Sequence, residues 1–152
     1  KALINSKKNY VVIFPNNDLG SDIIINEYKK LKNKNNFRVF PSLRFEYFLS
    51  LLFYSDFIIG NSSAGIREAP FYKKPSINIG TRQNNRSNDK NIIHCNNNLS
   101  EIEKAINSIN YKKKSKNSNF QFGTGDSDKK FIKIIKNESF WKTNKQKQFQ
   151  DV

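Results

Sequence analysis

Short, largely apolar runs alternate along the chain with longer stretches in which apolar and polar residues are mixed. Five runs of four or five residues are bounded by Pro, Gly, Asn or Asp, which is typical of strands. The longer stretches carry apolar residues at helical spacing. Strands that alternate with helices predict a parallel sheet covered by helices, an α/β fold. The expected strands are residues 10–14, 37–40, 57–60, 76–79 and 92–95.

The stretches between the strands predict amphipathic helices. These lie at about residues 21–34, 43–55, 99–109 and 126–136, and a shorter helix is expected around Arg67. Because residues 10–14 are all apolar, we expect the first strand to be buried on both faces. The helix at 43–55 is expected to be deeply packed through Phe45, Phe48, Leu49, Leu52 and Phe53. Together these elements describe a Rossmann-like, doubly wound open parallel sheet.

The same pattern predicts how the chain is divided. Residues 1–137 are expected to form an incomplete α/β domain, and residues 138–152 a tail that is polar apart from Phe140, Trp141 and Phe149. Residues 112–119 are charged and rich in Ser and Asn, which is typical of a solvated linker. The chain of 152 residues contains no Met, so we expect it to be a fragment of a longer protein.

The charge of the chain first points to a nucleic-acid binder. Lys and Arg number 27 against 13 Asp and Glu, for a net charge of +14. However, 22 Lys occur together with 23 Asn, 18 Ile and 13 Phe, all encoded by A/T-rich codons, so a codon bias explains the excess. The charge is also spread along the chain, and no segment forms a basic arm. Specific nucleic-acid binding is therefore not expected.

The sequence also argues against a membrane protein and a cysteine-based site. No apolar run approaches the ~18 residues of a membrane span, and no targeting segment is recognisable, so a cytoplasmic protein is expected. The single cysteine, Cys95, excludes an internal disulfide and a cysteine-based zinc cluster. His94 and Cys95 are interpreted as structural. We expect no metal and no cofactor.

Three loops follow strands at the edge where open α/β sheets bind ligands. In the loop at 61–65, small residues and hydroxyls precede a helix, and a helix N-terminus attracts a phosphate group. Ser62 and Ser63 are equally well explained as a plain helix cap. Glu68, in the following helix, has the chemistry to bind a ribose diol, or it is a surface residue that complements the helix dipole.

The other two loops carry weaker signals. Arg82 and Arg86 are two of only five arginines, and arginine suits bidentate phosphate or carboxylate binding, although a simple surface loop is an alternative. Asn16 and Asp18 are turn formers unless a sugar lies nearby. No Ser–His–Asp triad and no pair of acid and base carboxylates is recognisable, so no catalytic residue is expected in this chain.

Four segments in order resemble the UDP-N-acetylglucosamine 2-epimerase family, in particular its hydrolysing branch. They are residues 14–21 (Phe-Pro-Asn-Asn-Asp-Leu-Gly-Ser), 60–70 (Gly-Asn-Ser-Ser-Ala-Gly-Ile-Arg-Glu-Ala-Pro), 75–83 (Pro-Ser-Ile-Asn-Ile-Gly-Thr-Arg-Gln) with Arg86, and 122–125 (Phe-Gly-Thr-Gly). The last segment departs from the family pattern, because Thr124 replaces an Asp and Phe122 a Tyr. The resemblance implies that residues 1–137 are the C-terminal nucleotide-binding domain of a GT-B-like two-domain fold, without the N-terminal catalytic domain.

The resemblance also implies the roles of individual residues. Ser62, Ser63 and Gly65 would hold the diphosphate of a nucleotide sugar, Glu68 the ribose, and the helix from Leu43 to Phe48 would flank the base. Arg82, Gln83 and Arg86 would lie near the phosphates or brace the loop that binds them, and Asn16 and Asp18 would face the sugar. The full-length enzyme would convert UDP-N-acetylglucosamine to N-acetylmannosamine and UDP as a homo-oligomer, and the fragment alone would be inactive.

Other functions compete with this one. A related epimerase would act on another nucleotide-activated amino sugar, such as a GDP-linked sugar of the legionaminic acid pathway. A GT-B glycosyltransferase would use the same half-domain to bind its donor. A basic nucleic-acid-binding module would need aromatic residues between basic residues on one exposed face.

Overall fold

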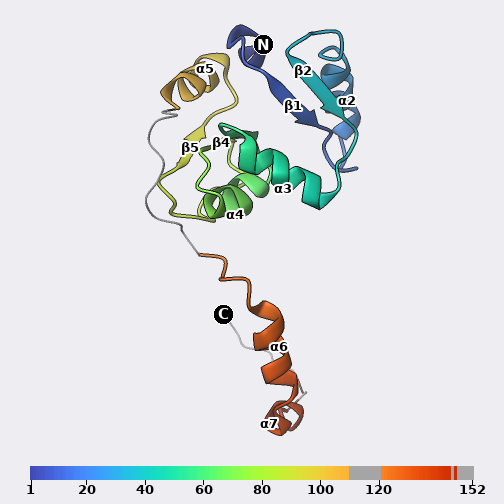
Figure 1. Cartoon of the computed structure of the whole chain (residues 1–152), viewed down its shortest axis with the longest axis vertical. Coiled ribbons are helices and arrows are strands. Elements are labelled where there is room, and N and C mark those ends of the chain that lie inside the picture. Colours follow the sequence, from blue (N-terminus) through green and yellow to red (C-terminus); the bar gives the residue numbers. More distant parts are fainter. Residues whose placement is uncertain (110–120, 145, 147–152) are drawn as a thin grey trace. The chain divides into compact units, whose positions relative to one another are not determined.

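The computed structural model describes residues 1–109, 121–144 and 146. The chain forms two compact units, Lys1–Asn119 and Phe120–Val152 (Figure 1). In the part of the chain that the structure describes, no helix combines the length and apolarity needed to cross a membrane. The linker expected at 112–119 and Phe149 lie outside the described residues. The domain boundary expected after residue 137 stays a prediction.

All strand pairs in the first unit are parallel, as the alternating pattern predicts. Strand β1 (Tyr10–Ile13) pairs with β2 (Phe37–Phe40). Strand β4 (Ser76–Ile79) lies between β3 (Ile58–Gly60) and β5 (Ile92–Cys95). The five expected strands are therefore all present, but they form a two-stranded and a three-stranded sheet rather than one sheet. The apolar pattern predicts where strands lie and does not specify which strand edges pair.

The helices connect the strands as expected, with shorter bounds. The first unit contains α1 (Ala2–Asn5), α2 (Ser21–Lys29), α3 (Phe45–Tyr54), α4 (Ala64–Phe71) and α5 (Leu99–Ser108). The second unit contains α6 (Ser127–Ile135) and α7 (Glu138–Trp141). The short helices α1 and α7 are not predicted from the sequence, because four residues are too few to show a helical period.

The core lies between the three-stranded sheet and α5. Ile77 of β4 is fully buried and packs in one cluster with Ala105 and Ile106 of α5 and Ala2 of α1. This confirms the predicted apolar face of α5. On the other face of the sheet, Gly65 of α4 lies against Ser76 of β4. Because neighbouring strand residues point to opposite faces, α4 and α5 cover opposite sides of this sheet, as in a doubly wound fold (Figure 1).

Two predictions about burial are wrong. Val11 of β1 is 45% exposed, because β1 belongs to a two-stranded sheet that is not covered on both faces. Of the five apolar residues of α3 expected to be deeply packed, only Leu52 is buried, and Phe45 and Phe53 are 59% and 51% exposed. Helical spacing predicts which residues share a face, and it does not establish that another element covers that face.

Candidate functional site

The loops after β3 and β4 lie side by side at the carboxyl edge of the three-stranded sheet. Gly60, the last residue of β3, is in register with Asn78 near the end of β4. The loop at 61–63, here called the serine loop, and the loop at 80–86, here called the arginine loop, therefore leave the sheet at the same edge. The Nε2 amide of Gln83 donates to the carbonyl oxygen of Asn61 at 2.9 Å and joins the two loops directly.

The serine loop ends at the exposed start of helix α4. Ser63 is the N-cap residue, and its side chain makes no capping hydrogen bond. The Ser62 hydroxyl oxygen accepts a hydrogen bond from the Ala64 N–H at 3.3 Å. The plain-cap interpretation therefore does not hold for Ser63 and applies to Ser62 only through this long contact. Both side chains are exposed at the positive end of the helix dipole, where an anionic group is stabilised.

Gly65 is buried beneath this helix start rather than exposed on it. A Cβ added at Gly65 would collide with Ser76 Oγ of β4 and would lie 3.7 Å from Ser76 Cβ. The Gly65 N–H donates to the Ser62 carbonyl oxygen at 3.2 Å. The missing side chain thus lets α4 approach the sheet closely and sets the position of the serine loop.

Glu68 lies one turn further along α4 and has an unusual environment. Its side chain is half-buried, and its Oε2 atom is buried without a hydrogen-bond partner within the described residues. Buried carboxylate oxygens are normally hydrogen-bonded, because leaving one unpaired costs free energy. The arrangement fits an acceptor that receives a hydrogen bond from a donor outside the protein, such as a hydroxyl group.

The arginine loop presents two guanidinium groups. Arg82 and Arg86 are exposed, whereas Gln83 between them is only 1% exposed. Arg86 Nη1 donates to Gln83 Oε1 at 3.2 Å. The loop turns sharply at Gly80, with φ at 77°. It therefore carries two exposed cations on a segment whose centre is buried.

The other predicted residues are not tied to this cluster by the contacts of the described residues. Asn16 and Asp18 are exposed in the loop between β1 and α2, and β1 belongs to the two-stranded sheet. The backbone carbonyl of Asp18, not its side chain, accepts from Ser21 N–H at 3.0 Å. Phe48 is half-buried and stacks on Phe45 with ring centroids 6.3 Å apart.

Asn78 is a site-supporting residue that the sequence analysis missed. It is 2% exposed, and its Nδ2 donates to the Gly80 carbonyl oxygen at 3.1 Å and lies 3.1 Å from His94 Nδ1. Its Oδ1 has no hydrogen-bond partner within the described residues. The sequence could have indicated this role, because an amide stands within the largely buried strand Ser76-Ile77-Asn78-Ile79. A buried polar group needs hydrogen-bond partners.

Cys95 at the end of β5 has the features of a structural residue. Burial raises the pKa of its thiol, and the nearby Glu101 carboxylate raises that pKa further. The thiol therefore stays protonated near neutral pH and is a poor nucleophile. The Cys95 carbonyl accepts from the Gly80 N–H at 2.8 Å, which ties the start of the arginine loop to β5.

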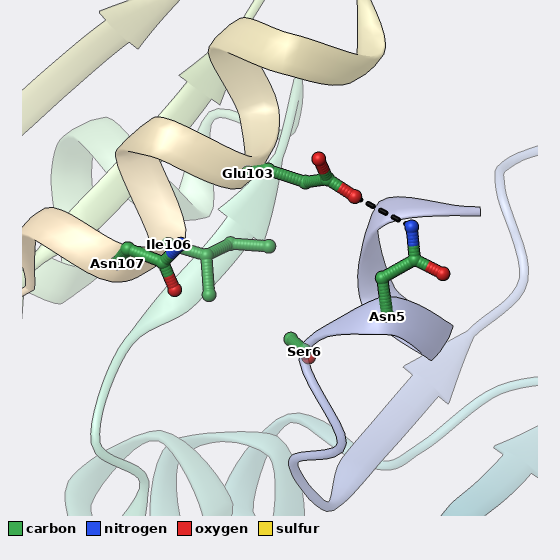
Figure 2. Close-up of a pocket in the computed structure, with 5 residues that line it drawn as sticks. All are labelled: Asn5, Ser6, Glu103, Ile106 and Asn107. Atoms are coloured by element: carbon green, nitrogen blue, oxygen red, sulfur yellow. Dashed lines mark hydrogen bonds between the residues drawn. The ribbon is translucent and has the colours of Figure 1, made fainter.

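A separate pocket lies away from this edge, between α1 and α5. It has a volume of about 190 Å³ and is lined by Asn5, Ser6, Glu103, Ile106 and Asn107 (Figure 2). Asn5 Nδ2 donates to Glu103 Oε1 at 2.6 Å across it. Ligand pockets usually measure ~300–1,000 Å³, so this one is small for a nucleotide sugar. None of the candidate site residues predicted from the sequence lines it.

The fold and the edge cluster define a parallel α/β protein with its candidate site at the carboxyl ends of the strands. The chain belongs to the UDP-N-acetylglucosamine 2-epimerase family, whose model matches residues 1–136. This confirms the resemblance found in the sequence.

Individual relatives support the assignment over much of the chain. A UDP-N-acetylglucosamine 2-epimerase from Neisseria meningitidis serogroup B is 44% identical over 100% of this chain. A hydrolysing GDP/UDP-N,N'-diacetylbacillosamine 2-epimerase from Campylobacter jejuni is 33% identical over 75% of it. The matched regions cover 41% and 30% of these relatives, so the chain spans about two-fifths of the length of the Neisseria relative.

A solved structure shows the same fold. The UDP-GlcNAc 2-epimerase of Methanocaldococcus jannaschii, in complex with UDP-GlcNAc and UDP, superposes with a TM-score of 0.71 at 20% identity. The match covers 89% of this chain and 37% of that chain. The predicted GT-B-like α/β class is thereby confirmed.

Proposed function

We propose that this chain is the nucleotide-diphosphate-binding part of a hydrolysing UDP-N-acetylglucosamine 2-epimerase. The observation that carries the proposal is the buried, unpartnered Oε2 of Glu68, one turn from the exposed start of α4. A nucleotide sugar suits both features, because its ribose hydroxyls donate hydrogen bonds to a carboxylate oxygen and its anionic diphosphate is stabilised at a helix start. Membership of the epimerase family agrees with this ligand chemistry.

In the proposed site, the residues of α4 and of the two loops have roles that follow from their positions. The exposed hydroxyls of Ser62 and Ser63 bind the diphosphate at the helix start, and Gly65 sets the depth of that helix. Glu68 accepts from the ribose. Arg82 and Arg86 add positive charge from the arginine loop. The family resemblance, rather than a contact with this cluster, is the basis for proposing that Phe48 flanks the base and that Asn16 and Asp18 face the sugar.

The proposed reaction has two steps that balance. The C2 proton and the UDP group leave the sugar, so that a C1–C2 double bond forms. Water then adds across this bond, with hydroxyl on C1 and hydrogen on C2 in the inverted configuration, which yields N-acetylmannosamine. Negative charge grows on the leaving diphosphate, so the positive end of the α4 dipole, the exposed hydroxyls of Ser62 and Ser63, and the arginines stabilise the transition state as well as the bound substrate. No acid or base is assigned to residues of this chain.

The test is UDP binding to the full-length protein, measured by isothermal titration calorimetry. Glu68→Ala is expected to weaken UDP binding about tenfold or more, because a ribose hydroxyl loses a charged acceptor. Glu27→Ala is the matched control, since Glu27 is exposed in α2 and pairs only with Lys30 in the described contacts. Equal affinities of Glu68→Ala and the unchanged protein would remove Glu68 from the site, and absence of any nucleotide binding would refute the function.

A second candidate substrate is a GDP-linked or bacillosamine-type amino sugar. The similarity to the Campylobacter jejuni enzyme, whose name includes both GDP and UDP, favours including it. Competition of GDP against UDP in the same titration separates the two. We further propose that the full-length enzyme is a homo-oligomer, and light scattering measures its mass in solution. We also propose that it works in the cytoplasm.

A further inference from the structure

We propose that Gln83 is a positioning residue: it holds the serine loop and the arginine loop together so that both bind the same diphosphate. The inference rests on the proposed function. Of the two roles that the resemblance left open for Gln83, contact with the phosphates or bracing of the loop that binds them, it selects the second and names the two segments that Gln83 joins.

The geometry of Gln83 supports a link rather than a ligand contact. The side chain is 1% exposed, and both ends of its amide are occupied. Nε2 donates to the Asn61 carbonyl oxygen at 2.9 Å, and Oε1 accepts from Arg86 Nη1 at 3.2 Å. Asn61 immediately precedes Ser62, and Arg86 is exposed. One buried amide therefore connects the backbone of the serine loop to a guanidinium of the arginine loop.

The chemistry requires an amide at this position. The link needs a donor toward Asn61 and an acceptor toward Arg86, and the glutamine side chain offers both at one end of its stem. A glutamate would keep the acceptor for Arg86 but would place an oxygen against the Asn61 carbonyl. A methionine would fill a similar volume and offer neither hydrogen bond of this kind.

The arginine loop is fixed at its start, and the link at Gln83 ties it to the neighbouring loop at a second point. The Gly80 N–H donates to the Cys95 carbonyl at 2.8 Å, and the Gly80 carbonyl accepts from Asn78 Nδ2 at 3.1 Å. These bonds hold Gly80 on the sheet. Gln83 then fixes the middle of the loop to the neighbouring serine loop. Losing the Gln83 link would remove this direct connection between the two loops while leaving Gly80 in place.

The test compares UDP with uridine, which lacks the phosphates, as ligands of the full-length protein. Gln83→Met is expected to raise the Kd of UDP about tenfold, as the loss of charge-assisted hydrogen bonds predicts, and to leave the Kd of uridine unchanged. Asn84→Ala, an exposed residue of the same loop, is the matched control and should bind both ligands normally. A general loss of structure would instead weaken both ligands together.

A second variant separates the two ends of the amide. Gln83→Glu keeps the acceptor for Arg86 and removes the donor to Asn61, so it should lose UDP affinity and retain uridine affinity. Wild-type UDP affinity in either folded variant would overturn the proposal, as would equal losses for UDP and uridine. Failure of both variants to fold would also overturn it, because Gln83 would then serve the fold. If the unchanged protein binds neither UDP nor GDP, the proposed function itself fails.

Discussion

The close approach of α4 to the sheet allows a sharp test of how the serine loop is positioned. In Gly65→Ala, the added methyl group collides with Ser76 Oγ, and Ser76 is 2% exposed, so the surrounding side chains restrict any movement. Overpacking of a buried contact costs about 1–3 kcal/mol. The higher helix propensity of Ala offsets at most about 1 kcal/mol of this loss in stability. Taking about 2–3 kcal/mol for a methyl group that collides with a buried atom and subtracting about 1 kcal/mol leaves a net loss of about 1–2 kcal/mol, which lowers Tm by roughly 2–8 °C for a chain of this size.

The double variant Gly65→Ala/Ser76→Ala identifies the cause. It removes Oγ and leaves the new methyl group 3.7 Å from the remaining Cβ, an ordinary van der Waals contact. Thermal unfolding followed by circular dichroism should therefore show higher stability for the double variant than for Gly65→Ala, with Ser76→Ala as the control. UDP affinity should follow the same order, because Ser63 is the N-cap residue directly before α4. A Gly65→Ala protein as stable as the unchanged one, or a double variant without recovery, would show that Ser76 rotates away freely and would refute this reasoning.

Further predictions concern pH and buried polar groups. Hydrogen bonds from the backbone and side chain of Asn96, and from Asn98, hold the pKa of the Glu101 carboxyl below its usual range. A lowered carboxyl pKa stabilises the fold above the usual value and loses that effect as the pH falls through the folded value, so Glu101→Gln should flatten the acid side of a Tm-against-pH profile. Asn78→Leu removes the donor to Gly80 and should cost about 1–3 kcal/mol in urea unfolding, and an unchanged midpoint would contradict that role.

The positions of the strands were predictable because each strand is a short, largely apolar run with a breaker on both sides. The pairing of β1 with β2 in a separate two-stranded sheet was not predictable, because strands pair through backbone groups that are the same for every sequence. The buried face of α5 was predictable because Ile102, Ala105 and Ile106 follow one helical stripe. Helix α3 shows the limit of the same method, because Phe45 and Phe53 belong to its apolar residues and are exposed. An apolar stripe is buried only where another element covers it, and the pattern does not predict that element.

Within the candidate site, the rule that ligands bind at the carboxyl ends of parallel strands selected the two loops that follow neighbouring strands. β3 and β4 are adjacent, and so the serine and arginine loops meet. Asn16 follows β1 in the other sheet, where the rule alone does not establish proximity. The burial of Gln83 was also beyond reach, because a polar residue between two arginines in a loop has the composition of a surface segment.

The anchoring of the arginine loop affects when its conformational entropy is lost. Gly80 is fixed to Cys95 and Asn78, and Gln83 to Asn61, before any ligand arrives. Ordering a free loop residue costs about 1–2 kcal/mol, and here that cost is incurred during folding rather than during binding. The guanidinium groups therefore meet an incoming anion from a preorganised backbone, so that more of the interaction free energy is expressed as affinity.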